Sequence, residues 1–261
     1  MSAKEIKKAK KMNTNSKTVS KTVSKSATKE LKISVVIPAL NEEKYIESCL
    51  KSLTKQTVQP YEIIVCDGNS EDKTREIAKR YADKVILERK RSAAAERQRG
   101  ANAAKGEIIA FIDSDTVAEK NWIKKIKEAF EKNHDVVAVY GKVLIRDGSK
   151  VDKILAKLFT PYTKFTELIG KPAVAGMNMA VRKDAFQKIG GFNLNLKTAE
   201  DIDLFNRLKK VGRIKYVDAV TYTSARRLKH WGYKKFFFFH ASNLIKYTLT
   251  GKSHEKYDET R

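Results

Sequence analysis

The chain has little of several features that mark particular classes of protein. Among its 261 residues only Cys49 and Cys66 are cysteines, which excludes a disulfide framework and indicates a reducing compartment. No stretch approaches the roughly 18 apolar residues of a membrane span, so an integral membrane protein is not expected. The N-terminal segment has lysines but no apolar run, so it is unlike a secretory signal. From these absences we expect a cytoplasmic protein.

Acidic residues are scarce relative to basic ones. Lys and Arg number 54 against 31 Asp and Glu, which gives a net charge of +23. Residues 1–32 hold ten lysines against two glutamates, and with few large apolar side chains they are expected to form a disordered basic tail. The charge raises nucleic-acid binding as an alternative function. However, the basic residues are spread along the chain and no recognition module is visible, so no nucleic-acid partner is expected.

Behind the tail, apolar runs alternate with amphipathic stretches. Strands are predicted at residues 33–38, 61–66, 84–87, 107–112 and 136–140, and helices at 42–53, 72–81, 93–104, 120–132, about 151–168 and 200–210. Strands separated by helical patterns of about 10 to 15 residues are typical of βαβ units and a parallel sheet. We therefore predict a single Rossmann-like α/β domain over residues 33–225, with a mostly parallel central sheet and helices on both faces.

Residues 226–261 are predicted to form a basic and aromatic helical extension. A helix from about 232 to 249 contains the run Phe236-Phe237-Phe238-Phe239 between lysines. One interpretation is a helix packed on the domain. The other is a helix lying on an anionic membrane, with its lysines and those of the tail meeting the lipid headgroups. The second interpretation fits a lipid-linked acceptor and a peripheral position on the cytoplasmic membrane face.

Polar and acidic side chains follow the first, second and fourth predicted strands. The fourth ends in Asp113-Ser114-Asp115, the first leads into residues 38–43, and Asp67 follows the second. Ligands of open α/β sheets bind outside the carboxyl ends of the strands, so these groups are expected to converge. Two carboxylates one residue apart can hold a hard divalent cation and bridge it to phosphate. Taken singly, each motif is also an ordinary turn or cap, with Asn41 as N-cap of the helix at 42–53.

A series of motifs lies in a fixed order between residue 33 and about residue 220. They are SVVIPALNEE from Ser34, EIIVCDGNS from Glu62, AERQRG from Ala95, GEIIAFIDSDT from Gly106, GGF from Gly190 and EDID from Glu200. Their order and spacing resemble the family-two inverting glycosyltransferases, which have the GT-A fold. One position departs from the family pattern, because Gln98 stands where the family usually has Asn.

For the donor, the resemblance implies a nucleotide-sugar carrying uracil or guanine, held by the strand ends and one helix. The implied nucleotide contacts are Pro38, Ala39, Asn41, Glu42, Asp67, Arg97, Asp113 and Ser114. Asp115, with Asp113 beside it, would ligate Mn²⁺ or Mg²⁺ bound to the diphosphate. A nucleotidyltransferase would instead have a Gly-rich basic loop after the first strand, where this chain has residues 38–43.

For the transfer step, the resemblance implies Asp201 as the general base, with Glu200 beside it near the acceptor. The acids at 200–203 are alternatively a helix start favoured by the helix dipole. Arg226 and Arg227 follow a predicted strand and either clamp the diphosphate or a phosphorylated acceptor, or form a solvated basic turn. The predicted function is metal-dependent, inverting transfer of a sugar from a UDP- or GDP-sugar to a saccharide hydroxyl or a lipid phosphate. The alternative is a nucleic-acid-binding or other basic nucleotide-binding protein without transferase activity.

Overall fold

The structure, a computed structural model, describes residues 30–150, 152, 154 and 174–254. The chain divides into two units, residues 1–30 and residues 31–261. The second unit is described here by itself. Most of the predicted tail, and the helix predicted near 151–168 apart from Asp152 and Ile154, lie outside the described residues.

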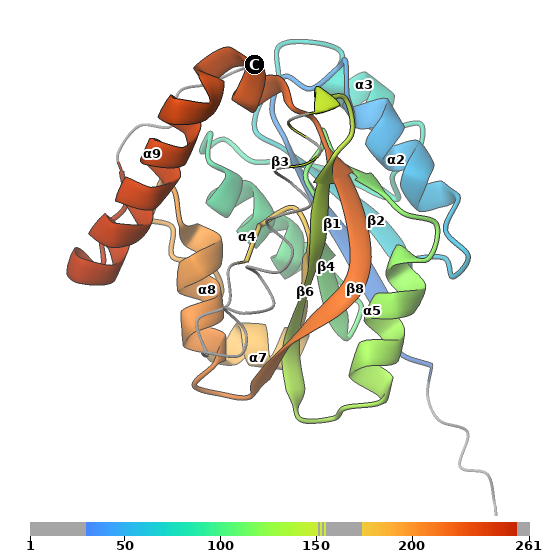
Figure 1. The fold of residues 1–261 in the computed structure, drawn as a ribbon. Helices are drawn as coiled ribbons and strands as arrows, with labels where there is room; N and C mark the ends of the chain where they lie inside the picture. Colours follow the sequence, from blue (N-terminus) through green and yellow to red (C-terminus); the bar gives the residue numbers. More distant parts are fainter. Residues whose placement is uncertain (1–29, 151, 153, 155–173, 255–261) are drawn as a thin grey trace, which may run out of the picture. The chain divides into compact units, whose positions relative to one another are not determined.

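Within the described residues, an eight-stranded sheet forms the centre of the second unit (Figure 1). Its strand order is β3-β2-β1-β4-β7-β6-β8-β5. In chain order the strands are β1 (Ile33–Ala39), β2 (Glu62–Asp67), β3 (Lys84–Leu87), β4 (Ile108–Phe111), β5 (Val117–Ala118), β6 (Val136–Ile145), β7 (Met179–Arg182) and β8 (Arg213–Thr223).

The first four strands have the predicted parallel arrangement. β1 pairs in parallel with β2 and β4, and β2 pairs in parallel with β3. The other half of the sheet is mixed: β7 runs antiparallel between β4 and β6, β6 and β8 are parallel, and β5 is antiparallel to β8. The regular alternation of strand and helix that predicts parallel pairing ends after residue 131, so the parallel description applies to the first half alone.

Helices cover both faces of the sheet, as predicted. They are α2 (Ile46–Thr54), α3 (Thr74–Ala78), α4 (Ala93–Ala103), α5 (Trp122–Glu131), α7 (Lys183–Lys188), α8 (Glu200–Leu208) and α9 (Arg226–Thr250). One buried core joins the sheet to α2, α3 and α5, and a second joins it to α4, α7 and α8. Neighbouring residues of β1 serve different cores, Val35 the first and Val36 the second. This alternation is the period of two that a strand buried on both faces requires.

The predicted cap at Asn41 is wrong. Helix α2 begins at Ile46, and Asn41 has a φ of +54°, whereas an N-cap residue is usually extended. Its backbone N–H donates to Ser70 Oγ at 2.9 Å, and its side-chain oxygen accepts the Glu71 N–H at 2.9 Å. An asparagine tolerates the left-handed conformation that these bonds require. Asn41 therefore fastens the loop after β1 to the loop after β2.

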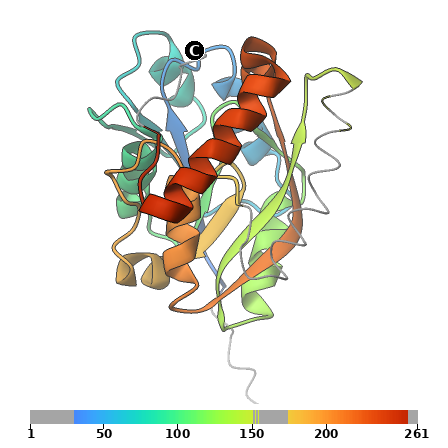
Figure 2. The same ribbon diagram turned by 60° about the vertical axis from the view of Figure 1, so that its left-hand side comes forward.

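The C-terminal aromatic helix predicted from about residue 232 to 249 is present, and a separate short helical segment precedes it. α9 begins at Arg226 and is interrupted at Gly232, whose φ is +72°. It runs beside α8 in Figure 1, its lower end comes near that helix again in Figure 2, and Tyr247 donates to Asp203 of α8 at 2.9 Å. Packing on the domain is therefore present. Among the described residues, no helix combines the length and apolar character needed to cross a bilayer.

Candidate functional site

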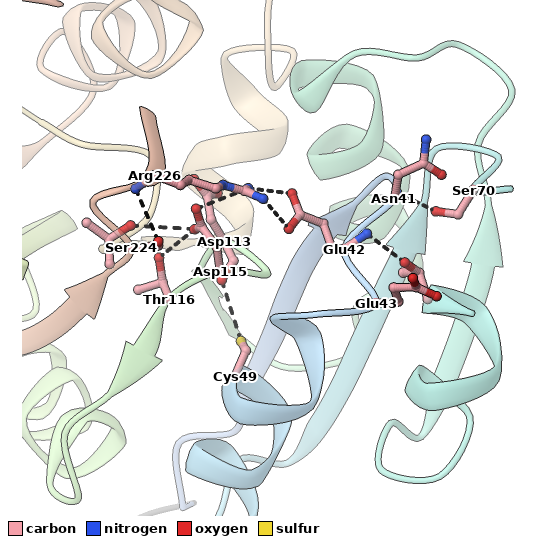
Figure 3. A network of polar contacts seen from close by, with 12 residues as sticks. Asn41, Glu42, Glu43, Cys49, Ser70, Asp113, Asp115, Thr116, Ser224 and Arg226 are labelled. Atoms are coloured by element: carbon pink, nitrogen blue, oxygen red, sulfur yellow. Dashed lines mark hydrogen bonds and ion pairs between the residues drawn. The ribbon is translucent and has the colours of Figure 1, made fainter. Parts of the chain in front are cut away.

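The loops that follow β1 and β2 are tied together beyond the Asn41 contacts. The Glu42 N–H donates to Thr74 Oγ1 at 2.7 Å, and the Glu43 N–H donates to Asp72 Oδ2 at 3.0 Å. Figure 3 shows these contacts on one side of Glu42 and the acidic end of β4 on the other. The two loops therefore form one braced unit at the carboxyl edge of the parallel half-sheet.

Asp67, the last residue of β2, is fully buried. Its Oδ1 accepts the Ser70 N–H at 2.9 Å and lies 3.4 Å from Arg75 Nε. Among the described residues, its Oδ2 has no hydrogen-bond partner. A buried acceptor without a donor costs about 1–3 kcal/mol, so this oxygen suits an N–H donor on a ligand.

Arg226, at the start of α9, joins the ends of β1 and β4 (Figure 3). Its two terminal nitrogens lie 2.8 and 2.5 Å from the Glu42 carboxylate, and Nη2 lies 3.1 Å from Asp115 Oδ2. All three side chains are largely buried. The guanidinium also lies over the Tyr45 ring, 4.7 Å from its centroid. The structure thus brings together three predicted site residues that are up to 184 positions apart.

The neighbouring cations do not fully compensate the burial of the Asp115 carboxylate. Burial raises its pKa and the neighbouring Asp113 adds to the rise, while Arg226 and Arg227 oppose it. The net shift is upward, so the ionised form is stabilised by additional cations. Among the described residues no three His, Cys, Asp or Glu side chains gather as a metal cluster. The two carboxylates nevertheless fit Mn²⁺ or Mg²⁺ as hard oxygen ligands, provided that phosphate oxygens complete the set.

A second arginine bridge links the acidic triplet to α8. Arg97 of α4 donates from Nη2 to Asp113 Oδ1 at 2.7 Å and from Nη1 to Glu200 Oε1 at 2.6 Å. Its side chain is 5 % exposed, so the two bonds hold both carboxylates firmly. A side chain at Gly176 would collide with this guanidinium, since its Cβ would lie 2.8 Å from Nη2.

Asp201 lies in the first turn of α8, beside Glu200. Its Oδ2 accepts the Gly176 N–H at 2.9 Å, and its Oδ1 accepts the Ile202 N–H at 2.8 Å. Burial, reinforced by the charge of Glu200, raises the pKa of Asp201 to about 7 against the opposing effect of Arg97. A carboxylate with a pKa near neutrality is suited to accept a proton from a hydroxyl group.

The structure also accounts for the departure at Gln98. Its Oε1 accepts the Phe192 N–H at 2.8 Å, and its Nε2 donates to Asn102 at 2.9 Å. Gly191 has a φ of +71°, and a Cβ there would lie 2.1 Å from Gln98 Oε1. The side chain therefore fastens α4 to the Gly-Gly-Phe loop, where only a glycine leaves it room.

The remaining predicted residues lie around these bridges. Pro38 and Ala39 end β1 opposite Cys66 and Asp67, and Ser114 is buried between the two aspartates. Arg227 acts on Asp115 through its charge. Sequence reasoning missed Gly176, which meets both Arg97 and Asp201. Nothing in the local sequence marks this glycine, because its partners are far away along the chain.

Comparison with known proteins gives a consistent picture. The model of "Glycosyl transferase family 2" matches residues 34–190. The glucosyl-dolichyl phosphate glucuronosyltransferase of Haloferax volcanii is 29% identical over 185 residues, covering 63% of this chain and 57% of that protein. S. aureus TarS in complex with UDP-GlcNAc superposes with a TM-score of 0.62 at 23% identity, covering 74% of this chain and 58% of that one. The mannosyltransferase PcManGT from Pyrobaculum calidifontis, in complex with GDP-Man and Mn²⁺, superposes with a TM-score of 0.58 at 20% identity. This match covers 74% of this chain and 57% of that one. The two structures confirm the fold.

The match covers only part of these relatives. The chain spans between 40% and 62% of the length of the first four curated proteins that it matches. The family match therefore describes the domain, and what the relatives do as whole proteins is a separate question.

Proposed function

The chain belongs to glycosyl transferase family 2, and from that membership and the geometry of its strand ends we propose that it is a glycosyltransferase. It takes a sugar from a UDP- or GDP-sugar and transfers it, with inversion, to an acceptor hydroxyl or lipid phosphate. The Arg97 bridge carries this proposal, because it joins Asp113 on the donor side to Glu200, the neighbour of Asp201, on the acceptor side.

The donor is bound by the braced loops and the acidic edge of the sheet. The free Oδ2 of Asp67 accepts an N–H of the base, and the Pro38–Glu42 turn holds the nucleoside. Asp113 and Asp115 would hold Mn²⁺ or Mg²⁺, which would neutralise charge on the diphosphate. Arg226 and Arg227 contribute guanidinium groups that suit phosphate oxygens. Arg226 already binds two carboxylates, and the diphosphate would take over part of that role.

The transfer step needs a base on the opposite side of the sugar from the leaving group. Asp201 accepts the proton of the acceptor hydroxyl. At the same time the hydroxyl oxygen attacks the anomeric carbon, and the bond from that carbon to the diphosphate breaks. Charge accumulates on the leaving phosphate, where the arginines stabilise it. One attack from the far face inverts the anomeric carbon. A lipid-phosphate acceptor would need no base, because its oxygen is already ionised.

Nucleotide titrations test the donor half of the proposal. We expect UDP or GDP to raise the melting temperature with Mn²⁺ present, and a panel of nucleotide-sugars to identify the base and the sugar. Asp115→Ala should abolish the dependence on Mn²⁺. Equal affinity with and without metal, in both wild type and variant, would remove the metal from the proposal. No response to any sugar nucleotide would contradict the proposal as a whole.

A further inference from the structure

The two faces of α9 have different surroundings. On the inner face, the Asn243 side-chain oxygen accepts the Thr198 hydroxyl and the His254 N–H, each at 2.9 Å. Tyr247 binds Asp203 on the same side. On the outer face, Phe238, Ile245 and Leu249 are 76%, 59% and 79% exposed. The inner face docks on the domain, and the outer face remains in solvent.

The exposed apolar side chains form one surface. Positions 238, 245 and 249 are separated by seven and four residues, which places them on one side of a helix. Phe237 and Leu244, 50% and 39% exposed, widen the same side. We call these five residues the outer face of α9. Contiguous apolar surface of this kind is uncommon in the absence of a partner.

The positive charge of α9 indicates what kind of partner its outer face would bind. Apart from Arg226, which is bound to Glu42 and Asp115, α9 contains five Lys and Arg residues and no Asp or Glu. Lys234 precedes Phe238 by one turn and Lys252 follows the end of the helix, so lysines lie at both ends of the outer face. A symmetric contact with a second copy would bring these lysines against one another, which is unfavourable. An apolar centre with lysines at its ends matches the interface of an anionic bilayer.

We propose that the outer face of α9 docks on an anionic membrane surface. The aromatic and aliphatic side chains enter the boundary between headgroups and acyl chains, and the lysines meet the lipid phosphates. The inner face then holds the segment before α8, through Thr198, at about one helix diameter, or roughly 10 Å, from the surface. If the proposed function is correct, Asp201 is thereby kept near an acceptor that is anchored in the membrane.

Vesicle co-sedimentation of the full-length chain tests the proposal independently of any transferase activity. Binding is measured on phosphatidylglycerol and on phosphatidylcholine vesicles at low salt. It is measured again at about 0.5 M salt, where the Debye length falls below about 8 Å and binding by charge alone is screened. We expect binding to phosphatidylglycerol, with a part that survives high salt. Wild-type protein that stays in solution with phosphatidylglycerol at low salt would overturn the proposal.

Matched serine variants separate the outer face from other exposed apolar residues. The test variant is Phe238→Ser/Ile245→Ser/Leu249→Ser, and the control is Tyr61→Ser/Leu87→Ser, also on exposed positions. One buried large apolar side chain contributes about a factor of ten or more, so the salt-resistant binding of the test variant should fall at least tenfold. The control should bind like wild type. Equal loss in both variants, or no loss in the test variant, would contradict the proposal.

A matched lysine set and a fluorescent reporter complete the experiment. Lys234→Gln/Lys246→Gln/Lys252→Gln should weaken low-salt binding more than Lys55→Gln/Lys79→Gln/Lys124→Gln. The emission of Phe238→Trp should shift to the blue on phosphatidylglycerol, whereas that of Leu87→Trp should not. If the wild type is a dimer that the serine variant dissociates, and neither binds vesicles, the outer face is instead a contact between copies.

Discussion

The proposed donor side and the proposed acceptor side of the site are held in different ways. On the donor side, several short hydrogen bonds join the loops after two adjacent strands, so each bond supports the others. On the acceptor side, the first turn of α8 is held by the single guanidinium of Arg97, by Gly176 and by the inner face of α9. The contacts that hold the donor side are therefore redundant. The acceptor side depends on a few contacts between residues that are far apart in the sequence.

The largest expected effect is that of Asp201→Asn on transfer. An amide cannot accept the acceptor proton, so the rate should fall by about 10²–10⁴-fold, the usual contribution of a general base. Donor binding should persist, because the nucleotide loops are not touched. Initial rates of nucleotide release with a hydroxyl acceptor, together with UDP or GDP titration, check both statements.

The pH profile sharpens this prediction. As the proposed base, Asp201 would act only when ionised, and its pKa is raised to about 7. The wild-type rate should therefore rise as the pH passes through about 7. Asp203→Asn is the control for the shape of the profile: that carboxylate binds Arg207 and Tyr247, so the rise near pH 7 should persist in this variant and be lost in Asp201→Asn. If the transfer rate of Asp201→Asn stays within a few-fold of the wild-type rate, Asp201 is not the base, and Glu200 becomes the candidate.

The next largest effect is on stability, from Arg226→Gln. The change removes the guanidinium that bridges the buried carboxylates of Glu42 and Asp115, which should lower the free energy of unfolding by about 3 kcal/mol. The matched control is Arg213→Gln, whose ion pair with Asp135 is solvent-exposed and should contribute much less to stability. Urea unfolding of the three proteins measures the difference. Equal losses would show that the bridge between β1, β4 and α9 is not a stabilising contact.

A third prediction concerns the stability of the acceptor side as a function of pH. The folded protein raises the pKa of Asp201 above its unfolded value near 4, so the carboxyl destabilises the fold once the pH exceeds that value. This penalty grows until the pH passes about 7. Asp201→Asn removes it, and at pH 8 the variant should be more stable than wild type by at least about 1 kcal/mol. Near pH 4 the two should be alike, and a constant difference across this range would argue against the raised pKa.

The features that the sequence predicts are those that depend on local patterns. The parallel half of the sheet follows from apolar runs alternating with helices, and the convergence of Glu42 and Asp115 follows from the rule that strand ends meet at one edge. The predicted start of α2 is wrong because Asn41 binds the loop after β2 instead of capping the helix. That choice depends on Ser70 and Glu71, which local reasoning does not see.

The sequence identifies the residues of the proposed acceptor side but not the contacts that they make. Glu200 and Asp201 are recognisable from the motif, whereas the bridge from Arg97 spans 103 positions. The antiparallel insertion of β7 is also a long-range choice, since its partners β4 and β6 precede it by dozens of residues. Short-range patterns determine individual elements. The pairing of distant elements is decided by which packing buries them together.

The smallest expected effect is that of Tyr247→Phe, and it tests whether α9 supports the acceptor side alone. The change removes one hydrogen bond to Asp203, which keeps two bonds from Arg207 at 2.8 and 2.6 Å. The free energy of unfolding should therefore fall by only about 1 kcal/mol. Because Asp203 lies in the helix that carries Asp201, the transfer rate should fall a few-fold while UDP or GDP affinity stays unchanged. Tyr61→Phe, on an exposed ring of the donor half, should change neither quantity. If donor affinity falls together with the rate, α9 supports the whole site, and the two sides are not mechanically separate.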